Sequence, residues 1–190
     1  MADRTSARQA VVASAQRRGR LPSLVAGVLE GGTLAWTGSA GAATGPDVQY
    51  RIGSITKTMT AVLVLQCVHD GLAGLDDPVG RFVPETGYSE ATLRALLSHG
   101  SGMQSEPVGP WWERSPGVDV AALLAANDGT AAVAAPGEFF HYSNLGFALL
   151  GEAVARIRDA SWWQLVQRRL LEPMQLRRTS YHPQPPHAQG

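Results

Sequence analysis

The chain has 190 residues, of which 44% are hydrophobic and 17% are charged, so it carries enough apolar material for the core of one folded domain. Sixteen basic residues balance sixteen acidic ones, which argues against a general nucleic-acid-binding surface and against a polybasic membrane anchor. The single cysteine, Cys67, excludes an internal disulfide and a cysteine-rich metal site.

The apolar stretches and the N-terminal residues indicate where in the cell the protein is expected. No apolar stretch reaches the roughly 18–20 residues that a membrane-spanning helix needs, so no membrane span is expected. The first 20 residues contain five arginines and no continuous apolar run. This pattern lacks the features of a secretory signal peptide and predicts a cytoplasmic protein.

The N-terminal part predicts a helix followed by a β-hairpin. Residues 5–18 carry apolar positions at helical spacing, and Gly19 ends the run. Residues 24–29 and 34–36 predict two strands joined by Gly31-Gly32, a pair suited to a tight hairpin turn. Because an isolated hairpin is not stable, we expect it to belong to a larger sheet, and an unpaired edge would invite self-association.

The rest of the chain predicts helices and a tail. The expected helices are residues 54–69, 90–98, 118–127, 145–158 and 161–171. The first of them is apolar on most faces, so we expect it to be buried at the centre of the fold. Two strands followed by many helices indicate an α+β (α/β) fold over residues 1–181, with a proline-rich tail at 182–190.

Ser54 and Lys57 begin the most apolar of the predicted helices. Residues three apart lie on one helix face, so the Lys57 amine can reach the Ser54 hydroxyl. A nucleophile at a helix N-terminus benefits from free N–H groups and the helix dipole, and a desolvated lysine can serve as its base. A serine that caps the helix, followed by a solvated lysine one turn later, would explain Ser54 and Lys57 without any catalytic role.

Lys57 is the only lysine among the sixteen basic residues, and all the others are arginine. A GC-rich genome explains the general preference for arginine. A lysine can give up its proton in a protein and an arginine cannot. The exception therefore indicates a position that requires amine chemistry, which favours the catalytic interpretation of Ser54 and Lys57.

Tyr142 and Asn144 form a second candidate pair, directly before an apolar helix. Capping of that helix by Ser143 or Asn144 would explain the segment without any chemistry. In the functional interpretation, the Tyr142 hydroxyl and the Asn144 amide face Ser54 and Lys57. Tyr142 would then share or relay a proton, and Asn144 would bind the substrate or Lys57.

Four segments together resemble the serine β-lactamase-like family. In chain order they are GSITKTMTAVLVLQCVHDGLAGLDDPV, LRALLSHGSGM, APGEFFHYSNLGFALLGEAVARI and LLEPMQLRRTSY. This bacterial family covers class C β-lactamases, D-alanyl-D-alanine carboxypeptidases (penicillin-binding proteins) and related esterases. The resemblance implies an antiparallel sheet flanked by helices plus a helical subdomain, of which the chain carries the N-terminal portion.

The resemblance implies roles for the four residues. Ser54 is the acylated nucleophile and Lys57 its base partner, while Tyr142 and Asn144 form the second motif. The N–H of Ser54 is half of the oxyanion hole. The implied substrate is a small-molecule ester or amide, such as a β-lactam, a D-Ala-D-Ala peptide or a small ester. The implied chemistry uses no cofactor and no metal.

The sequence departs from the family at the third motif, Lys-Thr/Ser-Gly or His/Trp-x-Gly on a late strand. Lys57 is the only lysine, and after Asn144 the glycines are Gly146, Gly151 and Gly190, none of which ends such a triplet. Trp36-Thr37-Gly38 matches by letter but lies on the front hairpin, and we interpret it as structural. The late strands of the sheet are missing from this chain.

This departure leaves two functional hypotheses open. The first is a serine hydrolase that forms an acyl-enzyme at Ser54. The second is a catalytically incomplete fragment, or a non-catalytic relative of the same fold. Other residues with reactive side chains are expected to be structural: His99 and His141 brace loops, and Cys67 and Trp162-Trp163 pack in the core. Trp111-Trp112 either walls a substrate cleft or packs its loop.

Overall fold

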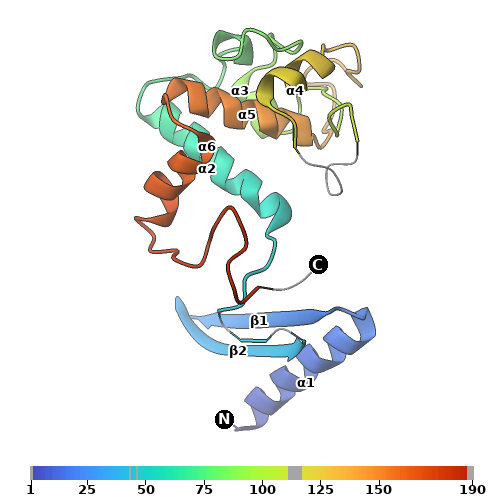
Figure 1. The fold of residues 1–190 in the computed structure, drawn as a ribbon, viewed down its shortest axis with the longest axis vertical. Coiled ribbons are helices and arrows are strands. Elements are labelled where there is room, and N and C mark those ends of the chain that lie inside the picture. The colour runs from blue at the N-terminus through green and yellow to red at the C-terminus, as the bar shows by residue number, and fades with distance from the viewer. Residues whose placement is uncertain (1, 43, 46, 111–116, 188–190) are drawn as a thin grey trace. The chain divides into compact units, whose positions relative to one another are not determined.

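The computed structural model describes residues 2–42, 44–45, 47–110 and 117–187, and the chain forms two compact units (Figure 1). One unit comprises Met1–Ile52 together with Leu176–Gly190. The other comprises Gly53–Gln175 and contains most of the helices.

The first unit contains the predicted helix and hairpin. Helix α1 spans Ala2–Gly19 and packs against the hairpin of β1 (Ser23–Glu30) and β2 (Thr33–Gly41). The strands pair antiparallel, with Ser23 opposite Gly41 and Glu30 opposite Thr33. Both turn glycines have positive φ, +57° at Gly31 and +79° at Gly32, as the tight turn requires. The hairpin prediction is therefore confirmed.

The C-terminal segment of the first unit is tied to the residues that follow the hairpin. The Gln49 N–H donates to the Pro186 carbonyl at 3.0 Å, and Gln49 forms an isolated parallel bridge with His187. The Arg178 guanidinium donates to the Asp47 carbonyl at 2.6 Å. Within the described ranges, no strand extends the two-stranded sheet beyond β1 and β2.

The second unit contains helical structure at all five places predicted downstream of the hairpin, with bounds that differ by one to three residues and with the last predicted helix divided into α6 and η4. Its regular elements are η1 (Gly53–Ile55), α2 (Thr56–His69), η2 (Val79–Arg81), α3 (Leu93–Leu97), α4 (Val120–Ala126), α5 (Asn144–Ile157), α6 (Trp162–Val166) and the π-helical η4 (Gln167–Leu171). No described helix is both long enough and apolar enough to cross a membrane.

Helix α5 is the central element of the second unit. It contacts α2, α3 and α6, and it buries one apolar side that includes Leu145, Leu149 and Val154. Its first turn is capped by the Ser143 hydroxyl, which accepts the Gly146 N–H at 2.9 Å. The helix start is thus fixed by a local hydrogen bond, and its packing by apolar residues at helical spacing.

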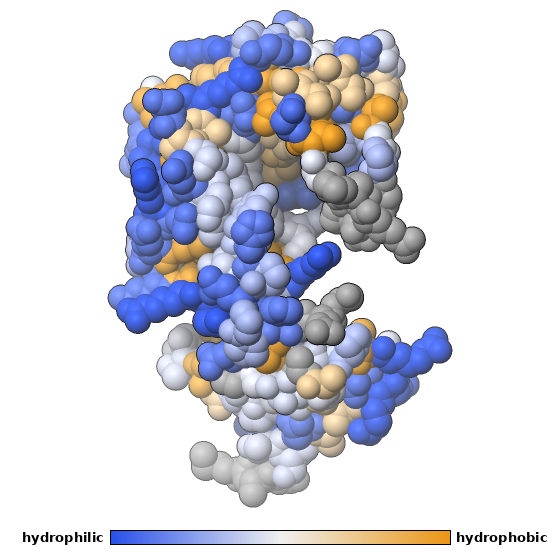
Figure 2. All heavy atoms as spheres, viewed as in Figure 1, coloured by the Kyte–Doolittle hydropathy of each residue, from blue (hydrophilic) through white to orange (hydrophobic). Residues whose placement is uncertain are grey.

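Helix α2 is less buried than its composition predicts. Leu63, Val64 and Cys67 are buried, but Ile55 just before the helix is 60% exposed, Val62 is 42% exposed and Leu65 is 49% exposed. Helices α5 and α6 contact α2, and these exposed residues are left uncovered. The expectation of a fully buried central helix is therefore wrong for this chain, because apolar content cannot say which elements are available to cover it. Hydrophobic residues are visible among hydrophilic ones on the helical unit in Figure 2.

Candidate active site

Ser54 lies in the 3₁₀ turn η1 that leads into α2, and Lys57 lies in the first turn of α2. The Lys57 Nζ donates to the Ser54 Oγ at 3.4 Å. The spacing of three residues therefore brings the two side chains together as the sequence predicts. Ser54 is exposed, so its hydroxyl is accessible to a small molecule.

Tyr142 and Asn144 reach the same place from the start of α5. The Tyr142 hydroxyl donates to the Ser54 Oγ at 2.8 Å, and the Lys57 Nζ donates to the Asn144 Oδ1 at 2.5 Å. Residues 54 and 142 are 88 positions apart, so only packing of α2 against α5 brings them together. The structure unites all four sequence-predicted site residues in one hydrogen-bonded cluster.

A loop at residues 98–106 holds the second motif in place. Its backbone carbonyls at His99, Gln104 and Ser105 accept hydrogen bonds from His141 N–H, the Ser143 hydroxyl and Asn144 N–H, at 2.8, 2.6 and 2.7 Å. These bonds join the loop to His141, Ser143 and Asn144, on both sides of Tyr142. The loop therefore holds the backbone that carries Tyr142 and Asn144.

Gly102 is required for the path of this loop. Its φ is +73°, and a Cβ at this position would lie 2.1 Å from the Ala134 carbonyl oxygen. The Gly102 carbonyl in turn accepts the Val133 N–H at 2.8 Å. A side chain would be excluded both by the backbone angle and by this close approach.

Glu106 is a member of the cluster that the sequence interpretation missed. The Asn144 Nδ2 donates to the Glu106 Oε1 at 2.6 Å. Asn144 thus stands between a cation and an anion, with its carbonyl oxygen on Lys57 and its amide nitrogen on Glu106. No spacing pattern indicates this pair, because the two residues are 38 positions apart and meet only through the loop contacts.

The neighbours of Tyr142 shift the pKa of its phenol. Partial burial opposes its ionisation, but hydrogen bonds to Lys57 and Ser54 and the positive charge of Lys57 outweigh burial and lower the pKa of Tyr142. The Lys57 Nζ also lies 4.9 Å from the centre of the Tyr142 ring. The ionised phenol is thereby easier to form than an ordinary tyrosinate, as a proton acceptor next to Ser54 requires.

His99 and His141 support the cluster without joining it. The His99 Nδ1 accepts the Ser143 N–H at 3.1 Å, and its ring lies 4.4 Å from the Tyr142 ring. Burial, and then the charge of Lys57, lowers the pKa of His99 and keeps it neutral at neutral pH. The His141 Nε2 shares a 3.0 Å hydrogen bond with the Ser105 hydroxyl. Both rings brace the loop, as the sequence predicts.

The remaining residues considered in the sequence analysis lie outside the cluster around Ser54. Cys67 is fully buried, and the Trp162 indole N–H donates to the Thr60 hydroxyl at 3.0 Å while its ring packs on the core. Trp36-Thr37-Gly38 lies on β2 in the first unit. Trp111-Trp112 lies outside the described residues. Among the side chains that the structure describes, no group of three or more His, Cys, Asp or Glu could hold a metal ion.

The pKa values of Tyr142 and Tyr88 are shifted in opposite directions, which predicts that Tyr142 ionises before Tyr88. Burial, and then the charge of Asp128, raises the pKa of Tyr88. In an alkaline titration followed by tyrosinate absorbance, the part of the change that Tyr142→Phe removes should lie at lower pH than the part that Tyr88→Phe, the matched control, removes. The reverse order in the two variants would contradict the assignment.

The fold and this cluster of serine, lysine and tyrosine define the class of the protein. A family model described as Beta-lactamase matches residues 8–190, and the chain belongs to that family. The fold class is the α+β fold of the β-lactamases and transpeptidases, with a two-stranded antiparallel sheet in the described part of the chain.

Individual relatives agree with this assignment. The D-alanyl-D-alanine-carboxypeptidase/endopeptidase AmpH of Escherichia coli K12 is 30% identical over 156 residues, covering 73% of this chain and 38% of AmpH. A D-stereospecific amidohydrolase from Streptomyces sp. has 32% identity and a TM-score of 0.78, covering 91% of this chain and 55% of that one. A class C β-lactamase shares the fold at 21% identity with a TM-score of 0.80, covering 93% and 51%. The chain thus spans between about a third and about half of the length of these relatives.

Proposed function

We propose that residues 1–181 are the N-terminal part of a serine hydrolase domain that forms an acyl-enzyme at Ser54 with an ester or an amide. One observation carries this proposal: the Ser54 Oγ is in hydrogen-bond contact with both the Lys57 amine and the Tyr142 phenol. A serine hydroxyl is a weak nucleophile, and an adjacent group that can accept its proton activates it.

The proposed reaction uses the four residues that the sequence predicted. As the Ser54 Oγ bonds to the substrate carbonyl carbon, its proton passes to Tyr142 or Lys57 in their deprotonated forms. The carbonyl oxygen becomes an oxyanion, and the Ser54 N–H donates to it as half of the oxyanion hole. The intermediate then collapses, the bond to the leaving amine or alkoxide breaks, and that group takes the proton. Asn144 orients Lys57 through the 2.5 Å hydrogen bond and is placed to bind the substrate.

The proposed substrates are small amides and esters, among them β-lactams and D-Ala-D-Ala peptides. The names of two relatives, an amidohydrolase and a carboxypeptidase/endopeptidase, describe amide hydrolysis. We therefore place amides first for this chain. The proposed chemistry needs no cofactor, because the cluster already contains the nucleophile and its proton acceptors.

Chemical labelling tests the nucleophile. We expect a fluorophosphonate or a penicillin probe to add one label to the chain, and peptide mass mapping should find it on Ser54. Ser54→Ala should abolish the label, while Ser23→Ala, at a serine of the other unit, should keep it. Label on Ser101 or Ser143, with Ser54 unmodified, would end the proposal. Both of those serines are buried, so labelling there would also require local opening.

The alternative function is that of a relative that keeps the fold and has lost catalysis. The sequence observation that favours it is the lack of a Lys-Thr-Gly or His/Trp-x-Gly triplet after Asn144. Labelling separates the two hypotheses, because a non-catalytic relative would leave Ser54 unmodified. We also propose that β1 and β2, which pair with no further strand among the described residues, support self-association, since unpaired strand edges pair readily with other chains.

A further inference from the structure

His99 occupies a backbone position that favours glycine. Ser98 is the C-cap of α3, and His99, directly after it, has a φ of +56°. Glycine, and less often asparagine, usually takes this left-handed position after a helix. The turn alone would therefore accept a residue without an imidazole, and the contacts of the ring indicate what histidine adds.

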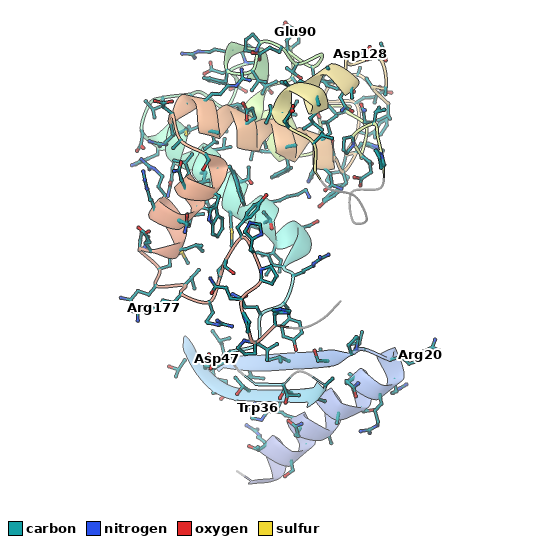
Figure 3. All side chains as sticks on the ribbon, viewed as in Figure 1. Arg20, Trp36, Asp47, Glu90, Asp128 and Arg177 are labelled. Atoms are coloured by element: carbon teal, nitrogen blue, oxygen red, sulfur yellow. The ribbon has the colours of Figure 1, made fainter. Side chains whose placement is uncertain are left out.

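The imidazole contacts both the main chain and a ring of the second motif. Its Nδ1 accepts the Ser143 N–H at 3.1 Å, and its ring centre lies 4.4 Å from that of Tyr142. The Phe147 ring of α5 lies 4.9 Å from it. Side chains fill the space between the ribbons of α2, α3 and α5 in Figure 3. The imidazole is thus part of the packing that places the Tyr142 hydroxyl 2.8 Å from the Ser54 Oγ.

The hydrogen bond to Ser143 requires a neutral imidazole. A ring nitrogen that accepts a hydrogen bond carries no proton, so the proton of the neutral ring is on Nε2. A proton added to Nδ1 would turn the acceptor into a donor that faces the Ser143 N–H, and the hydrogen bond would be lost. It would also add a positive charge close to that of Lys57. Burial, and then the charge of Lys57, already lowers the pKa of His99.

The ionisable groups around His99 come from three elements. Lys57 acts on it from α2, and the Tyr142 phenol lies beside it on the segment before α5. His141, on that same segment, donates its N–H to the His99 carbonyl. The Glu106 carboxylate, from the loop after α3, accepts its hydrogen bond from the amide of the second motif. After burial, the charge of Lys57 is the influence on the pKa of His99, and it opposes protonation.

We propose that His99 is a positioning residue for Tyr142, and that its neutral form alone holds the site in the arrangement that acylates Ser54. A proton on His99 breaks the hydrogen bond to Ser143, releases the Tyr142 ring and stops acylation. The inference rests on the proposed function of Ser54 and Tyr142. It adds a second ionisation to the pH dependence of the site, beside that of the group that takes the Ser54 proton.

The expected signature is the slope of the acylation rate against pH. A single base that must lose its proton makes the rate fall about tenfold for each pH unit below its pKa. Protonation of His99 adds a second requirement, so the rate should fall about a hundredfold per unit below the pKa of His99. Because that pKa is lowered from the ordinary histidine value of about 6.5, the steeper part should begin on the acid side of this value.

The test is the rate of fluorophosphonate labelling of Ser54 in the full 190-residue chain, measured from about pH 4.5 to about pH 9. His99→Asn is the decisive variant. Asparagine tolerates the left-handed backbone, its Oδ1 can accept the Ser143 N–H, and it does not titrate. At about pH 8 this variant should label at most about tenfold more slowly, the effect of weakening one neutral hydrogen bond. In acid its rate should fall by no more than about tenfold per pH unit.

His69→Asn makes the same exchange at an exposed histidine of the same unit and should keep the steep part. Circular dichroism at each pH restricts the comparison to folded protein. A steep part that persists in His99→Asn would overturn the inference, because the ring would then act by packing alone. An unchanged chain without a steep part would also overturn it, even if His99→Asn did not fold. Both results would leave Ser54 as the nucleophile. No label on Ser54 at any pH would overturn the proposed function and this inference with it.

Discussion

Replacing Lys57 by arginine should abolish acylation of Ser54, with a loss of about 10²–10⁴-fold in rate, the usual contribution of a positioned acid–base group. The change keeps the positive charge one turn from Ser54. It removes the ability to lose a proton, because a guanidinium stays protonated in proteins. The change also replaces a compact amine by a larger, planar guanidinium group. The amine Nζ lies 2.5 Å from the Asn144 Oδ1 and 3.4 Å from the Ser54 Oγ.

The measurement is the rate of p-nitrophenyl ester cleavage and of probe labelling, compared between Lys57→Arg and the unchanged chain. Arg168→Lys makes the reverse exchange at an exposed position of η4 and serves as the control. Near-unchanged rates in Lys57→Arg would mean that Lys57 supplies only charge or packing. That result would remove the base from the proposed reaction and leave Tyr142 as its only proton acceptor.

Adding a segment that contains the third motif to the chain should increase the turnover of substrate. A chimera would continue the chain after Gly190 with the C-terminal segment of the Streptomyces amidohydrolase. The family resemblance places the second oxyanion donor on a late strand, and loss of one such donor typically costs about 10²–10³ in turnover. The chimera should therefore turn over p-nitrophenyl esters or nitrocefin faster by about that factor.

The same chimera tests the sheet edge. If added strands pair with the hairpin, self-association measured by sedimentation should decrease as turnover rises. Ser54→Ala in the chimera controls for activity brought by the added segment. A short chain that is monomeric, melts cooperatively and turns over substrate as fast as the chimera would refute the claim that the third motif is needed.

Most of the regular structure was predictable from local patterns. The α1 helix, the hairpin turn and the five downstream helices each follow from apolar spacing and from glycines at positions with positive φ. The burial of α2 was not predictable in the same way. Apolar side chains lie on most of its faces, and their exposure depends on which other segments cover the helix.

In the candidate site, too, local contacts were predictable from the sequence and contacts that depend on the fold were not. Ser54 and Lys57 meet because they are three residues apart, which a sequence shows directly. Their contact with Tyr142 and Asn144 followed from the resemblance, since nothing local joins residues 88 positions apart. Glu106 was missed because its role depends on two backbone segments held together by hydrogen bonds. Backbone bonds of that kind leave no signature in side-chain identity.

The position between Tyr142 and Asn144 restricts how this chain can change. Ser143 is 1% exposed and takes no part in the proposed chemistry. Its hydroxyl accepts a hydrogen bond from the Gly146 N–H and donates one to the Gln104 carbonyl. Few side chains can do both in so small a space. A variant that kept Tyr142 and Asn144 but changed Ser143 would retain every reactive group and lose their alignment. Tolerance to mutation should therefore be lowest at a residue that never touches a substrate.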